Sequence, residues 1–248
     1  MNFLPGASPT TLIMLMLIAL LAGLSRGFSG FGAALIFVPL AGAFVSPKLA
    51  PPILVVIDGV FASYLIPSAF RFGNKSDVAL MFVGAIVGVP VGAFILTYCE
   101  PLTLRWLIAG MATAMLVLLA SGWRYHGQPH KAATVVVGAI SGLFSGIAQI
   151  GGPPVVSYWM GTDTAMDTLR SNIILFFAAT TVITVVTYFT GGLLTLEVVK
   201  FSLFAGPSYG IGTVIGSRMF GLASPQVFRT ISLLLIGFAV LTSLPLFK

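Results

Sequence analysis

The sequence predicts an all-α polytopic membrane protein with two inverted-topology repeats, each a glycine-broken or re-entrant helix hairpin followed by three transmembrane helices. Three observations predict it: an apolar composition, apolar segments of membrane-spanning length, and a similarity between the two halves. Of the 248 residues, 58% are hydrophobic and 7% are charged, whereas a soluble globular domain has about 25% charged residues. So few charges cannot cover a water-facing surface, and the mean hydropathy of +1.08 is typical of a chain that resides in a bilayer.

Six apolar segments reach or approach the roughly 20 residues that an α-helix needs to cross about 30 Å of hydrocarbon. They are residues 50–70, 77–98, 102–121, 169–190, 198–219 and 228–246. The other apolar segments form two pairs, each divided by a glycine-rich stretch and each with a short second member: 11–29 with 31–46, and 132–149 with 153–161. We expect each pair to form a broken hairpin, either as two short crossings or as a re-entrant loop.

The two halves share this order of elements, a broken hairpin followed by three full spans. Four residues also recur with the same spacing in both halves: Gly88, Gly92, Pro101 and Arg105 correspond to Gly212, Gly216, Pro225 and Arg229. Internal repeats of this kind are common in secondary transporters. The sequence therefore predicts a first transmembrane repeat at 1–121, a cytoplasmic connecting loop at 122–131 and a second transmembrane repeat at 132–248.

Lys and Arg residues near the span ends predict the orientation in the membrane. With the N-terminus outside, seven basic residues lie on the cytoplasmic side: Arg71, Lys75, Arg124, Lys131, Arg170, Arg218 and Arg229. The second half then starts from the inside, opposite to the first, so the repeats are inverted about a pseudo-two-fold axis in the membrane plane. The net charge of +6 is interpreted as this orientation signal, because the basic residues are scattered singly and form no patch for nucleic acid.

The two glycine-rich breaks form the candidate ligand site. They read RGFSGFGAALIFVP at residues 26–39 and SGIAQIGGPP at 145–154. Unpaired backbone groups are costly in hydrocarbon, so such breaks persist only where they are buried in protein or line a cavity. If both meet near the midplane, the helices that follow aim free N–H groups and positive dipole ends at one point, which favours an anion. The alternative is tight helix packing alone, because glycines also recur at every fourth residue within 23–27 and 138–146.

We therefore predict a substrate site at the junction of the breaks, extended by polar residues along the path. The predicted substrate-binding residues are Arg26, Ser29, Gly30, Gly32, Ser145, Gln149, Gly151, Gly152, Tyr158, Arg170 and Asn172. The glycines let the backbone approach a ligand closely, and the polar side chains supply donors. Tyr158 and Asn172 have an interhelical hydrogen bond as their alternative role, and Arg170 has anchoring at the cytoplasmic interface.

Two charged residues fall inside apolar sequence. Arg26 is either a counter-charge for the anion or a side chain that reaches the cytoplasmic interface. Asp58 lies within the span at 50–70, where a carboxylate favours its protonated form unless a cation pairs with it. Asp58 is thus a candidate for proton coupling, and an ion pair between Arg26 and Asp58 is the structural alternative.

The segments GLSRGFSGFGAALIFVPLA and GLFSGIAQIGGPPVVSYWM resemble the paired glycine-rich segments of the TauE/SafE sulfite exporter family. That pattern runs from G-x-x-x-G through a glycine triplet and apolar residues to Val-Pro, and the resemblance covers the whole chain. There are departures: Gly32 is followed by Ala33 and Ala34, and Ser157 stands where the first half has Pro39. The resemblance implies an integral membrane transporter that exports sulfite or an organosulfonate such as sulfoacetate.

We expect a secondary transporter in the cell inner (cytoplasmic) membrane, in which one half rocks against the other to give alternating access. A negative interior favours the exit of an anion by about 2.3 kcal/mol per charge per 100 mV. An anion channel for the same substrates and a transporter of another small organic anion are the alternatives. An enzyme is not expected, because the chain has neither G-x-S-x-G nor H-E-x-x-H.

The expected partners are the small anionic substrate and the lipid bilayer, with no nucleic acid and no cofactor. His126 and His130 would share a helix face, but Gly127 and Pro129 favour a loop, so no metal site is expected. A homodimer is left open, because the small-residue faces fit contacts within one chain as well as between two.

Overall fold

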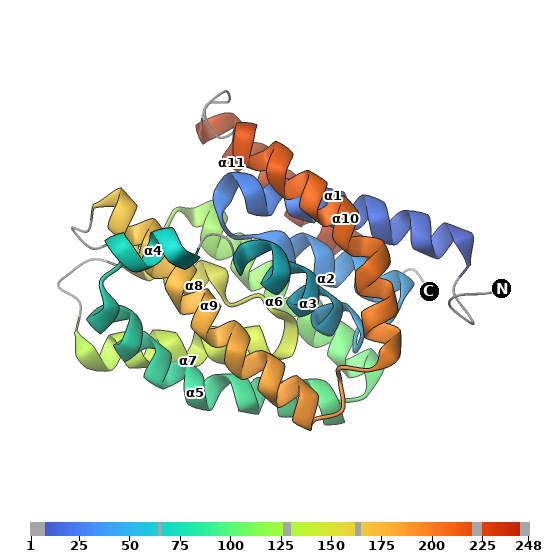
Figure 1. Ribbon diagram of the computed structural model, residues 1–248, viewed down its shortest axis with the longest axis horizontal. Coiled ribbons are helices and arrows are strands. Elements are labelled where there is room, and N and C mark those ends of the chain that lie inside the picture. Colours follow the sequence, from blue (N-terminus) through green and yellow to red (C-terminus); the bar gives the residue numbers. More distant parts are fainter. Residues whose placement is uncertain (1–7, 64–65, 126–129, 162–164, 220–224, 244–248) are drawn as a thin grey trace.

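The computed structural model describes residues 8–63, 66–125, 130–161, 165–219 and 225–243, and the regular structure in these ranges is helical (Figure 1). It contains eleven α-helices: α1 (Pro9–Ser29), α2 (Ala33–Phe44), α3 (Ala50–Ala62), α4 (Ile66–Phe72), α5 (Lys75–Tyr98), α6 (Pro101–Ser121), α7 (Lys131–Ala148), α8 (Gly152–Trp159), α9 (Met166–Thr190), α10 (Leu196–Met219) and α11 (Pro225–Ser243). The prediction of an all-α chain is confirmed.

Proline or a capping side chain defines several helix starts. Helices α1, α3, α6 and α8 have proline in their first two positions, where the missing N–H group would have had no helical partner. Asn74 caps α5, because its Oδ1 accepts the backbone N–H of Ser76 at 3.1 Å and of Asp77 at 3.4 Å.

Six of the described helices, α1, α5, α6, α7, α9 and α10, are long and apolar enough to cross a membrane, and α3 with α4 makes a seventh if that pair is one span. The chain is thus a multi-pass membrane protein. The continuous span predicted at 50–70 is instead a bent pair, since α3 and α4 are inclined by 68°. Pro67, near the start of α4, lacks the N–H that would continue the hydrogen-bond ladder of α3.

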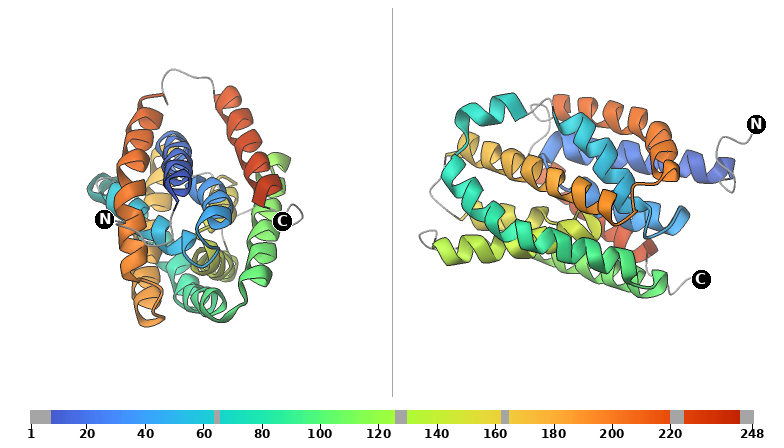
Figure 2. Two further views of the ribbon diagram at one scale, coloured as in Figure 1. Left: turned by 90° about the vertical axis from the view of Figure 1, so that its right-hand side faces the viewer. Right: turned by 60° about the horizontal axis from the view of Figure 1, so that its bottom comes forward.

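Both predicted pairs of a long helix followed by a short one are present, and their first members lie close to the predicted bounds. Helix α1 leads into the 12-residue α2, and α7 leads into the 8-residue α8, while α1 and α7 each reach spanning length alone. Helix α1 begins at the end of the bundle that carries the N-terminus, and α7 begins at the opposite end (Figures 1 and 2). The last predicted span is α11, which the structure describes as far as Ser243.

Two long helix pairs pack through glycine. Helix α5 lies along α7, and α1 lies along α10. A Cβ atom on Gly84, Gly88 or Gly92 of α5 would overlap backbone carbonyl oxygens of α7, and one on Gly23 or Gly27 of α1 would overlap those of α10. Such close backbone contact is the packing role that the four-residue glycine spacing suggests.

The distribution of side chains fits a bilayer. Large apolar side chains face outward on several helices, for example Phe189 at 74% and Phe94 at 63% exposed, and lipid can cover such surfaces without cost. Polar side chains such as Ser141, Asn172 and Thr184 are buried. The interior is therefore where the polar groups gather, and this is where the helix breaks lie.

Candidate functional site

The first break ends α1 and starts α2 through two glycines with positive φ. Gly30 (φ 75°) caps α1 and donates its N–H to the Arg26 carbonyl at 2.9 Å. Gly32 (φ 95°) is the N-cap of α2, and no side chain caps this helix start. Glycine adopts this left-handed conformation at little cost, so the chain reverses here within three residues.

The second break ends α7 at Gln149, the single non-glycine residue with positive φ (59°) among the described residues. Its backbone N–H bonds to the Ser145 carbonyl at 2.9 Å, and its side-chain Nε2 donates to the same carbonyl at 2.7 Å. These bonds occupy a carbonyl that the end of a helix would otherwise leave without a partner. The Ser141 hydroxyl further donates to the Gly151 carbonyl at 2.7 Å.

The two breaks meet. A Cβ atom on Gly152 would lie 3.5 Å from Cβ of Phe31, so the start of α8 touches the first break. Between them lies a cavity of about 50 Å³, here called the narrow cavity. Its lining includes Gly32, Ala33 and Ala34 from the first break, and Ser145, Gln149, Gly152 and Pro153 from the second, with Phe177, Thr180 and Thr181 of α9.

The two helix starts differ in the hydrogen-bond donors that they offer. In α2 the first residues, Ala33 and Ala34, keep their N–H groups and line the narrow cavity. In α8, Pro153 and Pro154 follow Gly152 directly, and proline has no N–H group. The first turn of α2 is therefore the better anion donor, and α8 contributes mainly the positive end of its dipole.

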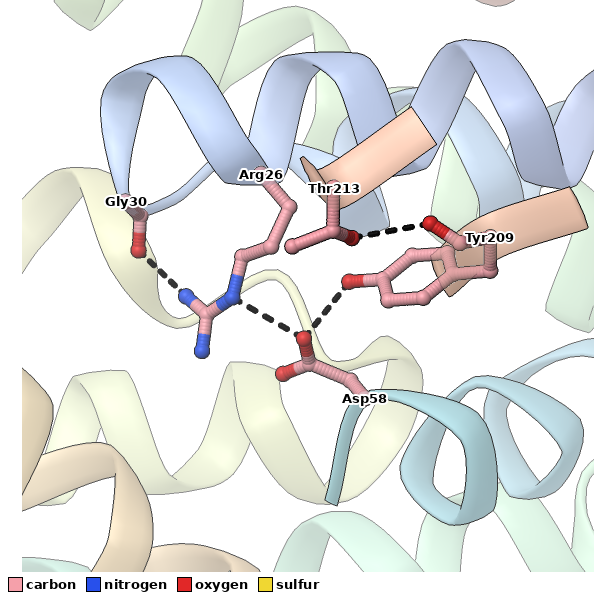
Figure 3. A network of polar contacts seen from close by, with 5 residues as sticks. All are labelled: Arg26, Gly30, Asp58, Tyr209 and Thr213. Carbon is pink, nitrogen blue, oxygen red and sulfur yellow. Dashed lines mark hydrogen bonds and ion pairs between the residues drawn. The ribbon is translucent and has the colours of Figure 1, made fainter. Parts of the chain in front are cut away.

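Figure 3 shows a network of charged and polar side chains, and two of its members, Arg26 and Asp58, line the narrow cavity. Arg26 of α1 bonds through Nε to Asp58 Oδ1 of α3 at 2.9 Å, and through Nη1 it donates to the Gly30 carbonyl. The Tyr209 hydroxyl of α10 donates to the same Asp58 oxygen at 2.6 Å, and Thr213 Oγ1 donates to the Tyr209 carbonyl at 2.9 Å. Asp58 therefore takes the ion-paired arrangement, one of the two alternatives that the sequence left open.

A second, larger cavity adjoins the same network. Its volume is about 490 Å³, and α1, α3, α8, α9 and α10 contribute to its lining; it is called the wide cavity below. Arg170 and Ser217 are among the polar residues that line it. Arg26, Phe31 and Asp58 line both cavities, so these three residues stand between the two spaces.

The structure brings most of the predicted site residues to these two cavities. Arg26, Gly32, Ser145, Gln149 and Gly152 line the narrow cavity, and Gly30 and Arg170 line the wide one. Gly151 packs behind the narrow cavity, where a Cβ atom would overlap the Ser145 hydroxyl. The side chain of Ser29 lies outside the part of the chain that the structure describes.

Tyr158 and Asn172 form the interhelical hydrogen bonds of their alternative role, and neither lines the narrow or the wide cavity. The Tyr158 hydroxyl is 2.7 Å from Thr134 Oγ1 in a buried contact between α8 and α7. Asn172 is also buried, and its Oδ1 accepts the backbone N–H of Asn74 at 2.7 Å, which ties α9 to the turn before α5. These hydrogen bonds, formed between distant parts of the chain, hold both side chains in helix packing. His126 lies outside the described residues, and His130 caps α7 through a bond from the Ala132 N–H to Nδ1.

The lining residues that sequence reasoning missed include Phe31, Thr180 and Thr181. Phe31 looked like ordinary apolar sequence, although its place between Gly30 and Gly32 is a signal that could have marked it. Thr180 and Thr181 are a polar pair within the apolar α9, a weaker signal. Tyr209 is a polar residue within the apolar span at 198–219, and its bond to Asp58 depends on the approach of α10 to α3.

Comparison with known proteins adds one finding. A profile of the family described as "Sulfite exporter TauE/SafE" matches residues 15–243. No curated protein and no solved structure gives a significant match to the chain.

Proposed function

The chain belongs to the sulfite exporter TauE/SafE family, and we propose that it exports a small sulfur-containing anion, sulfite or an organosulfonate such as sulfoacetate, by alternating access. Membership of this family makes the chain a membrane transporter rather than an enzyme. The observation that carries the proposal is the convergence of two helix breaks and the Arg26 guanidinium on one cavity. Guanidinium and backbone N–H groups are the donors that proteins use for oxyanions.

The size of the narrow cavity supports a small substrate. A buried water needs about 10–15 Å³ of such space, so about 50 Å³ admits a few waters or one small anion. The N–H groups at the start of α2, the Arg26 side chain and Gln149 surround this space. Sulfite and the sulfonate group of an organosulfonate both present negative oxygens to such donors, and a large organic anion would need the helices to separate.

We further propose that residues 1–121 and 132–248 are inverted repeats joined by the loop at 122–131. The support is that α1 packs along α10 while α7 packs along α5, which is the same pairing with the halves exchanged. Helices α1 and α7 also begin at opposite ends of the bundle (Figure 1). A pseudo-two-fold axis through the junction of the breaks accounts for both features.

In the proposed orientation, the wide cavity faces the cytoplasm, because Arg170 lies at its lining and basic residues favour that side. The anion enters the wide cavity, passes Arg26 and reaches the narrow cavity. In an inner membrane with a negative interior, its exit is favoured by about 2.3 kcal/mol per charge per 100 mV. Proton coupling through Asp58 stays a prediction.

Counterflow in proteoliposomes tests the proposal. Vesicles that hold the full chain and unlabelled sulfite or sulfoacetate should accumulate the labelled anion. Arg26→Ala should lower this uptake about tenfold or more, because hydrogen bonds to charged groups contribute about 1.5–3 kcal/mol. Arg71→Ala is the matched control, since Arg71 is an exposed cation on α4, and it should transport normally.

Two results would contradict the proposal. One is no flux of sulfite or sulfoacetate with the intact chain, which would remove sulfur anions as substrates. The other is a current across a planar bilayer that exceeds what a rocking cycle can deliver, which would favour the channel alternative.

A further inference from the structure

Three residues line both the narrow and the wide cavity. They are Arg26, Phe31 and Asp58. A solute that moves between these spaces must therefore pass a guanidinium, a carboxylate and an aromatic ring. The carboxylate is unexpected at this place, because it repels the anion that the family transports.

In this structure the Asp58 carboxylate and the Gly30 carbonyl occupy hydrogen-bond donors of Arg26. Arg26 bonds through Nε to Asp58 Oδ1 at 2.9 Å, and its Nη1 donates to the Gly30 carbonyl (Figure 3). The chain's own acceptors thus occupy donors that a bound anion would use. The pair is also only partly withdrawn from solvent, with side-chain exposures of 13% for Arg26 and 27% for Asp58, so its strength is moderate and another anion can compete.

Tyr209 stabilises the Asp58 carboxylate when an anion displaces it from Arg26. Its hydroxyl donates to Asp58 Oδ1 at 2.6 Å, and this is the oxygen that also receives Arg26 Nε. A partly buried carboxylate that loses its cation needs another donor to remain charged at low free-energy cost. Tyr209 is fully buried and packs against Phe61, so its hydroxyl stays in place if Arg26 moves away.

We propose that Asp58 is a built-in competitor for the substrate, which holds Arg26 across the passage between the two cavities until an anion takes its place. This inference rests on the proposed function and adds a selectivity mechanism to it. A neutral ligand cannot displace a carboxylate from a guanidinium, so only an anion breaks the pair and opens the passage. Because Arg26 also binds the Gly30 carbonyl, its movement acts directly on the first helix break.

Equilibrium binding to the purified full chain gives the first test, with sulfite and sulfoacetate as the probes. Asp58→Asn removes the competitor's charge and should tighten binding about fivefold, the effect of about 1 kcal/mol for a solvent-accessible ion pair. Tyr209→Phe should weaken binding, because the displaced carboxylate is then left without this donor. Asp58→Glu keeps the charge and should stay close to the original affinity. A purely structural role for Asp58 predicts weaker binding in both Asp58→Asn and Tyr209→Phe.

Cysteine labelling gives a second test that needs no ligand. In a Cys99→Ala background, Thr181→Cys places a thiol in the narrow cavity and Ser217→Cys places one in the wide cavity. A membrane-impermeant maleimide is added to vesicles of each orientation, and the orientation that labels Ser217→Cys identifies the side of the wide cavity. From that side, Asp58→Asn should speed the labelling of Thr181→Cys several-fold and leave Ser217→Cys unchanged.

The outcomes separate the inference from the proposed function. If the unmodified chain binds neither anion, the proposed function is overturned and the labelling still decides whether the pair closes the passage. If it binds anions but Asp58→Asn changes neither affinity nor labelling, the competitor role is wrong. Tighter binding with unchanged labelling would mean that Asp58 lowers anion affinity only through its negative charge. That result would also contradict the proposal that the ion pair closes the passage between the cavities. Thermal unfolding of each variant shows whether it is folded.

Discussion

Gln149 shows how one side chain can end a helix inside a membrane. A left-handed backbone costs a non-glycine residue about 1–2 kcal/mol, and Gln149 adopts it at φ 59°. Its Nε2 group bonds back to the Ser145 carbonyl, which also accepts the Gln149 backbone N–H, and so adds a second hydrogen bond at the end of α7. Glycine would fit this backbone better, so we infer that the Gln149 side chain also serves the narrow cavity that it lines.

Replacing Gln149 by glycine separates its two roles. Gln149→Gly relieves the left-handed strain, so the free energy of unfolding should rise by up to about 1 kcal/mol or stay constant. Anion affinity should fall several-fold, because a donor that lines the cavity is lost. Thermal unfolding and sulfite binding, measured on the same preparation, check both parts. Equal affinity in the variant and the unmodified chain would assign Gln149 to helix termination alone.

At the scale of helices, the glycines that recur between the halves are packing surfaces. Gly88 and Gly92 of α5 press against the backbone of α7, and Gly212 and Gly216 of α10 press against that of α1. Their equal spacing in the sequence thus reflects two helix pairs of the same kind. The breaks at Gly30 and Gln149 lie at the ends of these tightly packed helices, which fixes where the broken ends can point.

A single methyl group should disturb such a pair. In Gly88→Ala the new Cβ atom would overlap the Ala139 carbonyl oxygen of α7, so the two helices must separate, at a cost of about 1–3 kcal/mol. Gly110→Ala on α6 is the control, since nothing lies within 4 Å of its Cβ position, and alanine there should raise stability by about 0.5–1 kcal/mol. The detergent-solubilised variants are compared by thermal unfolding, and similar melting temperatures would contradict the packing account.

At the scale of the molecule, the spans α5, α6, α9 and α10 and the two glycine-rich breaks could be predicted because hydropathy and glycine act locally, whereas the bend between α3 and α4 was missed. The packing partners of the side chains could not be predicted, because they depend on which helices meet in the folded protein. Asn172 and Tyr158 were expected along the path or in an interhelical hydrogen bond, and the sequence could not say which distant segment each bonds to. Likewise, Tyr209 reaches Asp58 only because α10 crosses α3. A helical sequence does not state which face meets which neighbour, and in a membrane apolar side chains cover both lipid-facing and buried faces.

The packing also bears on which parts could move. The glycine pairs join α1 to α10 and α5 to α7, so each links the first half of the sequence to the second. Rocking of one sequence half against the other would break both pairs. We expect instead that one body, which includes α1, α2, α3 and α10, moves against another, which includes α5, α7, α8 and α9. The narrow cavity lies between these bodies, and Arg26, Asp58 and Tyr209 all belong to the first.

Two disulfide cross-links in a Cys99→Ala background test this division. Gly59 of α3 and Thr181 of α9 face each other across the two bodies, because a Cβ atom added at Gly59 would lie 3.5 Å from Cγ2 of Thr181. Gly206 of α10 and Ile57 of α3 are placed in the same way within one body, with a Cβ atom added at Gly206 lying 3.8 Å from Cγ2 of Ile57. Oxidation of the Gly59→Cys, Thr181→Cys pair should stop sulfoacetate counterflow and reduction should restore it, whereas the Ile57→Cys, Gly206→Cys pair should transport when cross-linked. Sulfoacetate is the substrate to use, because sulfite cleaves disulfides. Transport through the first cross-link, or a block by the second, would show that the moving bodies are divided elsewhere.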